Sequence, residues 1–445
     1  MTIDSSWIAC FKEEVPEAFR AAQPFRAKAV FCDGQIRLMR GNDWDFMTWD
    51  QYVWHQFHSH LKRFYEDGAD TVILAFDDYA HVPEAKCMTQ TKRRKHLPKL
   101  EILEREPLPP TVPSGEKWAQ SIANRVFKTK VIAMVIQELP RALKLTPTQT
   151  LVIDYAGTPE EYKMVDGELR TRPLPDLAPL GEADIKFTRY AEIYRDLLVD
   201  SVDGDSIPIA LIHQELAFSD LTMGTMRSED LAGAPPRICI RRITTRVDPL
   251  PKKRAKTEPA KRTFEYVNIP LLYHALRDIL LQCTGRVDAP LHSKHYMCML
   301  LGLIGLTGTD YTRSMPQVSG KTLFNLLPDL WVVLMRVYRP ETGQLDVDCT
   351  ADLLVAAVYA NKYSAHVKAS PSLQHVLLAL RASKLSERTR DSLPDVPRVK
   401  CTVRNINWLI RYWRDPALVP DPLACEEGLA TFGYVRRRGV VEYSH

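Results

Sequence analysis

Seven acidic residues occupy positions from which their carboxylates could act together. Two aspartates each follow a short apolar run, two acidic pairs have one residue between their members, and one more aspartate follows an apolar helical stretch. They are Asp33, Asp77, the pair Glu182 and Asp184, the pair Asp203 and Asp205, and Asp310. Taken singly, such residues are usually turn or helix-cap residues. A convergent group of this size would be strongly self-repelling unless cations neutralised it.

The chemistry that suits such a group is the binding of hard divalent cations. Ligation by oxygen alone favours Mg²⁺ or Mn²⁺. Two ions about 4 Å apart could activate a water molecule and stabilise the leaving oxygen of a phosphodiester, so no nucleophilic side chain is needed. We therefore expect a site for two Mg²⁺ ions, with Mn²⁺ as a substitute.

Short apolar runs and helical stretches alternate in the first half of the chain. The runs predicted as buried strands are Ala27–Phe31, Thr71–Phe76, Thr150–Ile153 and Ile207–Ile212. The predicted helices are Thr48–Glu66, Glu116–Leu139 and Glu182–Val199, and a turn at 165–168 predicts a small surface hairpin. This alternation predicts an α/β fold with a parallel sheet between helices. Functional sites of such sheets form at the carboxyl ends of the strands.

The remainder of the chain is predicted to be helical after one basic segment. Leu250–Arg262 is rich in Lys and Pro and should be a solvated loop, which could equally contact nucleic acid or act as a nuclear-import signal. The helices predicted after it are Ile269–Cys283, His295–Leu306, Lys321–Leu327, Ala351–Tyr363, Leu373–Ala382 and Arg404–Trp413. In the last of these, Trp408 and Tyr412 have helical spacing, which favours a core position over a base-stacking platform.

The composition is that of an ordinary globular protein. With 445 residues and 45% apolar content, the chain can bury one large core. The net charge of +4 neither requires nor excludes a nucleic-acid partner. Its nine cysteines include no pair spaced by two residues, so a zinc knuckle is not expected. The longest apolar run is too short to span a bilayer, which predicts a soluble intracellular protein without a membrane partner.

The order of the acidic motifs resembles the flap-endonuclease and XPG-like family of 5′ nucleases over most of residues 1–330. In chain order, the matching segments are WIACFKEEVPEAF, AVFCDG, ILAFDD, GEADIKF, VDGDSIPIA and GLTGTDYTRSMPQVSGKTLF. They resemble the family's opening helix, its first two metal-binding aspartates, its two acidic pairs, and its last aspartate with a helix-two-turn-helix element. By this resemblance all seven carboxylates are metal ligands. Asp78 is the alternative to Asp77, and Asp154 is a structural acid at a strand end.

The resemblance also implies a fold and its subdivisions. A PIN-like parallel, twisted sheet flanked by helices is expected in residues 1–330. Within it, residues 79–146 would form a helical gateway or arch insertion, residues 246–263 a basic loop, and residues 307–330 the helix-two-turn-helix element. Residues 331–445 would be a helical carboxyl-terminal extension that could bind a protein partner.

Basic residues directly after Asp77 resemble the gateway helix of the family, in the segment PEAKCMTQTKRRKH. By this resemblance Lys86 and Arg93 act catalytically by steering and stabilising the scissile phosphate, and Lys92 and Arg94 add supporting phosphate contacts. Without that neighbouring aspartate, a basic run would more often be a solvated helix face.

The segment Thr312–Lys321 resembles the family element that grips one duplex strand through backbone amides and a bound monovalent cation. Gln317 and Ser319 stand where the family has closely spaced glycines, so the sequence leaves cation binding open. The expected phosphate contacts are Ser314, Ser319, Gly320, Lys321 and Thr322.

The resemblance implies structure-specific cleavage of DNA at a 5′ flap or 5′ end, in replication, recombination or repair, and in the nucleus rather than the cytoplasm. Two alternatives keep the fold. PEAKCMTQTKRR and GEADIKF also resemble segments of 5′-to-3′ exoribonucleases, and a chain without catalysis would be a nucleic-acid-binding scaffold. We find no sliding-clamp peptide, and Met1-Thr2-Ile3 replaces the family's Met-Gly start. Such divergence would suit a viral or otherwise fast-evolving member.

Overall fold

A computed structural model gives the fold of most of the chain. The residues it describes are 4–39, 47–78, 105–177, 180–223, 237–245, 262–283, 295–309, 312, 314–368, 370, 372–416, 419, 421, 426–432, 434–437 and 440–443. Side chains at 218–223, 244–245, 262, 426–427, 437 and 440–443 are left out of the description. All structural statements below refer to these residues.

A nine-stranded mixed sheet forms the centre of the fold, in the order β1-β9-β8-β7-β2-β3-β4-β5-β6. Its five central strands are parallel: β8 (Arg237–Thr245), β7 (Asp196–Asp200), β2 (Ala29–Asp33), β3 (Thr71–Ala75) and β4 (Thr150–Asp154). The antiparallel margins are β9 (Arg262–Asn268) with β1 (Phe19–Arg20) on one side, and β5 (Glu160–Val165) with β6 (Glu168–Pro173) on the other. The sheet confirms the expected α/β class with a mostly parallel centre.

The order of the parallel strands reverses direction at β2. From β2 the chain adds β3 and β4 on one side, and β7 and β8 on the other. In open α/β sheets, ligands bind outside the carboxyl ends of the strands at such a switch point. The end of β2 at Asp33 and the loop after β7 lie at this position.

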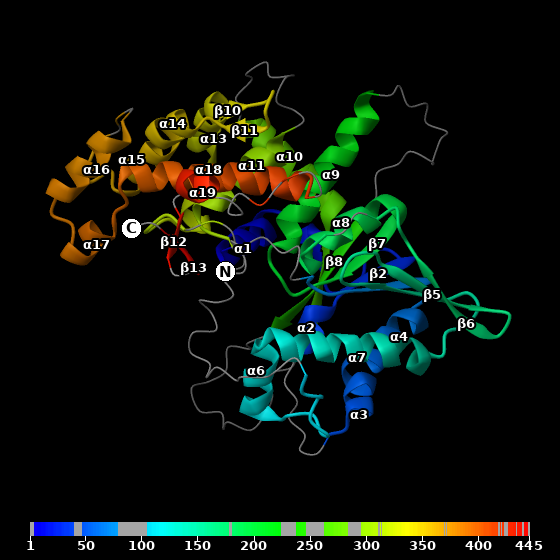
Figure 1. Cartoon of the computed structure of the whole chain (residues 1–445). Helices are drawn as coiled ribbons and strands as arrows, with labels where there is room; N and C mark the ends of the chain where they lie inside the picture. The colour runs from blue at the N-terminus through cyan, green and yellow to red at the C-terminus, as the bar shows by residue number, and fades with distance from the viewer. Residues whose placement is uncertain are drawn as a thin grey trace, which may run out of the picture.

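Helices cover both faces of the sheet, and successive strand residues alternate between two cores. One core contains Phe31, Ile73 and Val199 and is covered by α1 (Ser5–Glu14), α8 (Ala183–Ile193), α9 (Ser206–Met223), α10 (Ile269–Cys283) and α11 (Tyr296–Leu306). The other contains Cys32, Leu74 and Leu198 and is covered by α3 (Trp49–Val53), a π-helical turn (Trp54–His58), α4 (Ser59–Glu66), α6 (Gly115–Ala123) and α7 (Arg125–Leu143). Figure 1 shows these two groups on opposite sides of the sheet. A short helix, α2 (Gly34–Met39), follows β2 directly.

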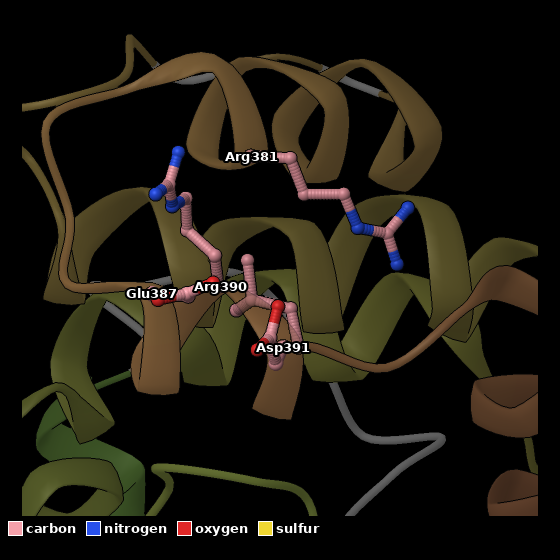
Figure 2. A pocket seen from close by; sticks show the side chains of 5 residues that line it. Arg381, Glu387, Arg390 and Asp391 are labelled. Carbon is pink, nitrogen blue, oxygen red and sulfur yellow. The ribbon is translucent and has the colours of Figure 1, made fainter.

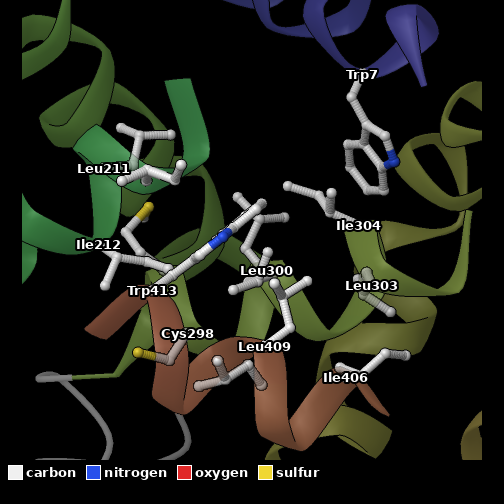
Figure 3. Close-up of a cluster of buried hydrophobic side chains, with 14 of the residues drawn as sticks. Trp7, Leu211, Ile212, Cys298, Leu300, Leu303, Ile304, Ile406, Leu409 and Trp413 are labelled. Atoms are coloured by element: carbon white, nitrogen blue, oxygen red, sulfur yellow. The ribbon is translucent and has the colours of Figure 1, made fainter. Parts of the chain in front are cut away.

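The carboxyl-terminal region packs onto the first of these cores. Its helices are α12 (Gly320–Asn325), α13 (Leu327–Val337), α14 (Val347–Cys349), a π-helical turn (Thr350–Val355), α15 (Ala356–Lys362), α16 (Leu373–Ala382), α17 (Glu387–Ser392), α18 (Val396–Arg414) and α19 (Glu426–Thr431). Two small hairpins join them: β10 (Tyr338–Arg339) with β11 (Gln344–Leu345), and β12 (Tyr434–Arg437) with β13 (Val440–Tyr443). Figure 3 shows Ile406, Leu409 and Trp413 of α18 among side chains of α9 and α11. Residues on either side of position 330 thus share one core.

Most of the predicted elements are confirmed. Three predicted strands correspond to β2, β3 and β4, and the predicted hairpin is β5 with β6. The helix predicted at Glu116–Leu139 is present but divides at Asn124, whose side chain accepts from the N–H of Phe127 and so starts α7. In the carboxyl-terminal third, α16 matches its prediction and α18 contains the helix predicted at Arg404–Trp413.

Two neighbouring predictions are wrong. Ile207–Ile212 is the start of helix α9 and not a strand, and the helix predicted at Glu182–Val199 ends at Ile193, after which Asp196–Asp200 forms strand β7. The run Ile207–Ile212 is buried throughout, so it has the uniform apolar character that short buried strands also have. Pro208 fits this helix because it lies in the first turn, where no intrahelical N–H bond is lost.

The strands β8 and β9 were missed. They flank the basic loop predicted at 246–263. Residues 246–261 lie outside the described part of the chain, and Arg262 and Thr263 belong to β9 and not to a loop. No helix of the described residues is both long enough and apolar enough to cross a membrane.

Candidate metal centre at the carboxyl end of the sheet

Asp33 and Asp77 lie side by side at one edge of the sheet because they end neighbouring parallel strands. Asp33 is the last residue of β2, and Asp77 comes two residues after the end of β3. Both side chains are buried. The N–H of Gln35 donates to Asp33 Oδ1 at 2.8 Å, which orients this carboxylate at the start of α2.

The amino end of α8 lies against the end of β3. The N–H of Ala183 donates to Asp77 Oδ1 at 3.0 Å, and the N–H of Asp78 donates to the carbonyl of Gly181 at 2.6 Å. Asp184 lies in the first turn of α8. These bonds bring an acidic residue that is distant in sequence to the carboxylates at the strand ends.

The loop after β7 supplies the second acidic pair. Asp203 Oδ1 accepts from the N–H of Asp205 at 3.1 Å, and the N–H of Asp203 donates to Ser201 Oγ at 3.2 Å. These short-range bonds form a compact turn before α9. Asp203 is partly exposed, whereas Asp205 is buried.

The electrostatics of Asp33 show which carboxylates converge. Burial raises the pKa of Asp33 well above its ordinary value, and the charges of Asp184, Asp77 and Asp203 raise it further. Asp33 and three other predicted ligands, Asp77, Asp184 and Asp203, therefore lie close enough for the charges of the three to act on Asp33. We call these four residues the acidic cluster. A divalent cation would turn this repulsion into attraction, and the all-carboxylate set of oxygens suits Mg²⁺ or Mn²⁺.

The other predicted ligands have different positions. Glu182 is buried at the N-cap of α8, and its Oε1 accepts from the hydroxyl of Tyr412 in α18 at 3.4 Å. In sequence, Glu182 lies two residues before Asp184 and Asp205 lies two residues after Asp203. Asp310 lies outside the described residues, as do the four basic residues predicted to contact the phosphate, Lys86, Lys92, Arg93 and Arg94. Their roles stay predictions.

A second polar group lies on the opposite face of the same strands. This group consists of Cys32, His60 and Asp200, whose possible ligand atoms all lie within 4.8 Å of one another. Among the described residues, no other three His, Cys, Asp or Glu side chains meet this criterion. However, Asp200 Oδ1 accepts from Arg241 Nε at 2.9 Å, and Oδ2 accepts from Arg37 Nη2 at 3.1 Å.

These ion pairs argue against a metal at Asp200. Burial would raise the pKa of Asp200, but the hydrogen bond from His60 and the charge of Arg241 outweigh it, so this pKa lies well below its ordinary value. Burial lowers the pKa of His60 to about 4 and raises that of Cys32 well above its ordinary value. Two guanidinium groups already neutralise the only anion, so a further cation would meet net repulsion. We interpret this group as a structural clamp between β2, β7 and β8.

Asp154, the structural acid at the end of β4, is also neutralised internally. Its carboxylate accepts from the hydroxyl of Tyr190 at 2.9 Å and pairs with Lys186 at 3.0 Å and with Arg189. The side chain is 1% exposed. These contacts support its assignment as a structural residue.

The backbone amides expected to grip a phosphate already have acceptors within the chain. The N–H of Gly320 donates to Asp4 Oδ2 at 2.8 Å, and the N–H of Lys321 donates to Ser6 Oγ at 3.1 Å. The N–H of Thr322 donates to Ser319 Oγ at 3.2 Å, which caps α12.

Gly320 also has a packing role. A Cβ at this position would lie 2.6 Å from Ser6 Oγ and 2.6 Å from Trp7 Cδ1, so α1 occupies the space beside it. Phosphate binding by Ser314, Ser319, Gly320, Lys321 and Thr322 stays a prediction, and within this set it rests chiefly on the exposed Lys321 side chain.

A shallow hollow in the carboxyl-terminal region involves none of the predicted site residues. It is lined by Arg381, Glu387, Arg390, Asp391 and Leu393. Figure 2 shows that the two arginine side chains extend in different directions. Arg381 also donates to the carbonyl of Pro394 at 3.0 Å. Because the cations do not converge and acidic side chains lie among them, the hollow has no evident anion site.

Sequence reasoning missed Lys186, Arg37, His60, Asp200 and Arg241. Asp200 carried a signal, because it ends the short apolar run of β7 as Asp33 ends that of β2. The others carried none, since their roles depend on contacts between residues far apart in the chain.

No protein-family model matches the chain, and no curated protein matches it in sequence. The resemblance to the 5′ nucleases therefore rests on the order and spacing of the acidic motifs alone.

Proposed function

We propose that this protein is a metal-dependent 5′ nuclease that hydrolyses DNA phosphodiesters with two Mg²⁺ ions. The observation that carries the proposal is the acidic cluster. Its four carboxylates come from four separate chain segments, and three of them act through their charge on Asp33 at the switch point of a parallel sheet. Gathering like charges around the buried Asp33 is costly for folding, which is the usual mark of a site kept for function.

In this proposal, the metal ligands come from the strand ends and from the segments that precede or begin helices. Asp33 and Asp77 stand at the strand ends, while Asp184 and Asp203 belong to α8 and to the loop before α9. When bound, two Mg²⁺ ions would provide Lewis-acid stabilisation of the phosphodiester and a nucleophilic water. The carboxylates would hold and orient these ions, and Asp184 and Asp203 are partly exposed.

The proposed substrate is DNA with a 5′ flap or a 5′ end, and the proposed fold is PIN-like. The motif order supports both, as does the sheet with parallel strands in the order β8-β7-β2-β3-β4. Lys86 and Arg93 would offset charge on the scissile phosphate, and Lys92 and Arg94 would support its binding. A role in replication, recombination or repair follows from this substrate.

The test is a cleavage assay with and without Mg²⁺ on labelled 5′-flap DNA, nicked duplex, single-stranded DNA and single-stranded RNA. Asp203→Asn removes one negative ligand while keeping the size of the side chain. The matched control is Asp196→Asn, at the amino end of β7, where the carboxylate pairs with Arg237 at the surface. We expect Mg²⁺-dependent DNA cleavage by the wild type and by Asp196→Asn, and a loss of at least about 100-fold in Asp203→Asn.

The same assay separates the alternatives. Cleavage of RNA alone would assign the chain to the exoribonuclease branch, and product length would distinguish flap removal from cleavage at ends. Binding of DNA without cleavage of any substrate would indicate a scaffold. Equal activity of Asp203→Asn and wild type would exclude this acidic cluster as the catalytic centre.

A further inference from the structure

Lys186 is a buried cation in the second turn of α8, and all of its described contacts are at the ends of two strands. Its Nζ donates to the carbonyl of Phe76 at 2.7 Å and to the carbonyl of Asp154 at 3.2 Å. The same atom lies 3.0 Å from Asp154 Oδ1. With the side chain 1% exposed, these bonds fix its position within the protein interior.

These bonds connect the end of β3, which leads to Asp77, with helix α8, which carries Asp184. Phe76 directly precedes Asp77, and Asp184 lies two residues before Lys186 in the same helix. The bond from the N–H of Ala183 to Asp77 Oδ1 closes the connection at the amino end of α8. A shift of α8 along the sheet would break the Lys186 bonds and would change the separation of Asp184 from Asp33 and Asp77.

Neutralising Asp154 does not by itself account for Lys186. Asp154 also pairs with Arg189 and accepts from Tyr190, so one carboxylate has two cationic partners. Burying a second cation is costly unless further hydrogen bonds offset its desolvation, and Lys186 makes such bonds to the two carbonyls. The excess positive charge lies at the ends of β3 and β4, where Lys186 donates to the carbonyl of Phe76, the residue before Asp77 of the acidic cluster.

We propose that Lys186 is a positioning residue of the metal centre. It holds α8 at the ends of β3 and β4 so that Asp77 and Asp184 bind metal together with Asp33. This inference rests on the proposed function, because it presumes that the acidic cluster binds divalent cations. Lys186 acts through the position of these ligands and is not itself a ligand.

The test compares Lys186→Met with the wild type in two measurements, the affinity for Mn²⁺ by calorimetric titration and the thermal denaturation in EDTA. Lys128→Met is the matched control, because Lys128 is also buried but lies on α7, which covers the other face of the sheet. We expect Mn²⁺ to bind Lys186→Met about 10- to 100-fold more weakly than the wild type, the range found for residues that orient metal ligands. Lys128→Met should keep the affinity of the wild type even where its stability falls.

A second variant guards against loss of folding. Lys186→Gln removes the cation and shortens the side chain but keeps a polar group, and Asp154 keeps Arg189 and Tyr190 as partners. We expect it to fold and to bind Mn²⁺ as weakly as Lys186→Met does. Wild-type Mn²⁺ affinity in either folded variant would overturn the positioning role and leave the proposed function standing. Absence of Mn²⁺ binding by the wild type would overturn both.

Discussion

At the scale of single residues, the pKa values of two buried carboxylates shift in opposite directions on the two faces of the sheet. Asp33 faces other carboxylates, and burial together with Asp184 and Asp77 raises its pKa. Asp200 faces Arg37, Arg241 and His60, which hold its pKa low. The alternation of side chains along β2 and β7 separates the two groups. Only the first group has unbalanced negative charge for a cation to neutralise.

Asp33→Asn should make the protein more stable in EDTA and insensitive to Mg²⁺. Removing one charge relieves repulsion in the acidic cluster, which should raise the free energy of unfolding by about 1 kcal/mol or more. The wild type should be stabilised by millimolar Mg²⁺, because the ion binds only the folded state. Thermal denaturation of both proteins with EDTA and with Mg²⁺ checks this. Equal stabilisation of both proteins by Mg²⁺ would count against Asp33 as a ligand.

The raised pKa of Glu215 should make the free energy of unfolding depend on pH. Burial raises the pKa of this carboxyl group to about 7, although it accepts from the N–H groups of Met297 and Cys298 at the start of α11. A carboxyl group with a raised folded-state pKa adds stability that is fully present below the unfolded-state pKa of about 4.5 and is lost as the pH rises through about 7.

Glu215→Gln should therefore gain stability relative to the wild type as the pH rises from 5 to 8, by about 1 to 3 kcal/mol. Urea denaturation at several pH values measures the difference. Parallel pH profiles of the two proteins would show that Glu215 does not titrate in this range.

At the scale of elements, close helix contacts position the site. Helix α8 brings Asp184 to the strand ends, and α18 contacts both α8 and α11 through Tyr412 and Ile406. In α11, a Cβ on Gly305 would lie 2.7 Å from Ile406 Cγ1, whereas one on Gly302 would lie 3.1 Å from Leu345 Cδ1. The α11–α18 contact thus depends on glycine more strongly than does the α11–β11 contact.

Gly305→Ala should lower the free energy of unfolding by about 1 to 3 kcal/mol, because overpacking moves α18 away from α11. Gly302→Ala should cost less, since the end of a leucine side chain can adjust. Denaturant titration of the two variants gives both values. A smaller loss in Gly305→Ala than in Gly302→Ala would contradict the close helix contact.

The sequence predicted those elements in which the local pattern of apolar residues matches the burial that they have in the fold. Strands β2 and β3 are short apolar runs that end near an acidic residue, so both the strands and the site residues Asp33 and Asp77 were predictable. Helix α9 has the sequence pattern of a buried strand because its first turns are buried on all sides. The bonds of Lys186 to Phe76 and Asp154 span 110 and 32 residues, a separation that no local pattern indicates.

At the scale of the whole molecule, residues 331–445 complete the main core and do not form a separate body. Figure 3 shows side chains of α1, α9, α11 and α18 in this core, drawn from both sides of residue 330. Tyr412 of the same region reaches Glu182 beside the acidic cluster. The carboxyl-terminal helices therefore support the site as well as the fold.

The whole chain should unfold in one cooperative transition, and residues 1–330 alone should not fold stably. Without α18, the α11 side chains Leu300, Ile304 and Leu306 would lose part of their cover. Calorimetry of the full chain and circular dichroism of the fragment test this. Two separate transitions, or a stably folded fragment, would contradict the shared core.

The central claim is that the acidic cluster at the carboxyl end of β2 and β3 binds two divalent ions. The most direct test is an anomalous difference map from crystals soaked in Mn²⁺. We expect two peaks about 4 Å apart among Asp33, Asp77, Asp184 and Asp203. A map with no peak at these carboxylates, or with its only peak beside Cys32, His60 and Asp200, would rule out a two-metal site in the acidic cluster.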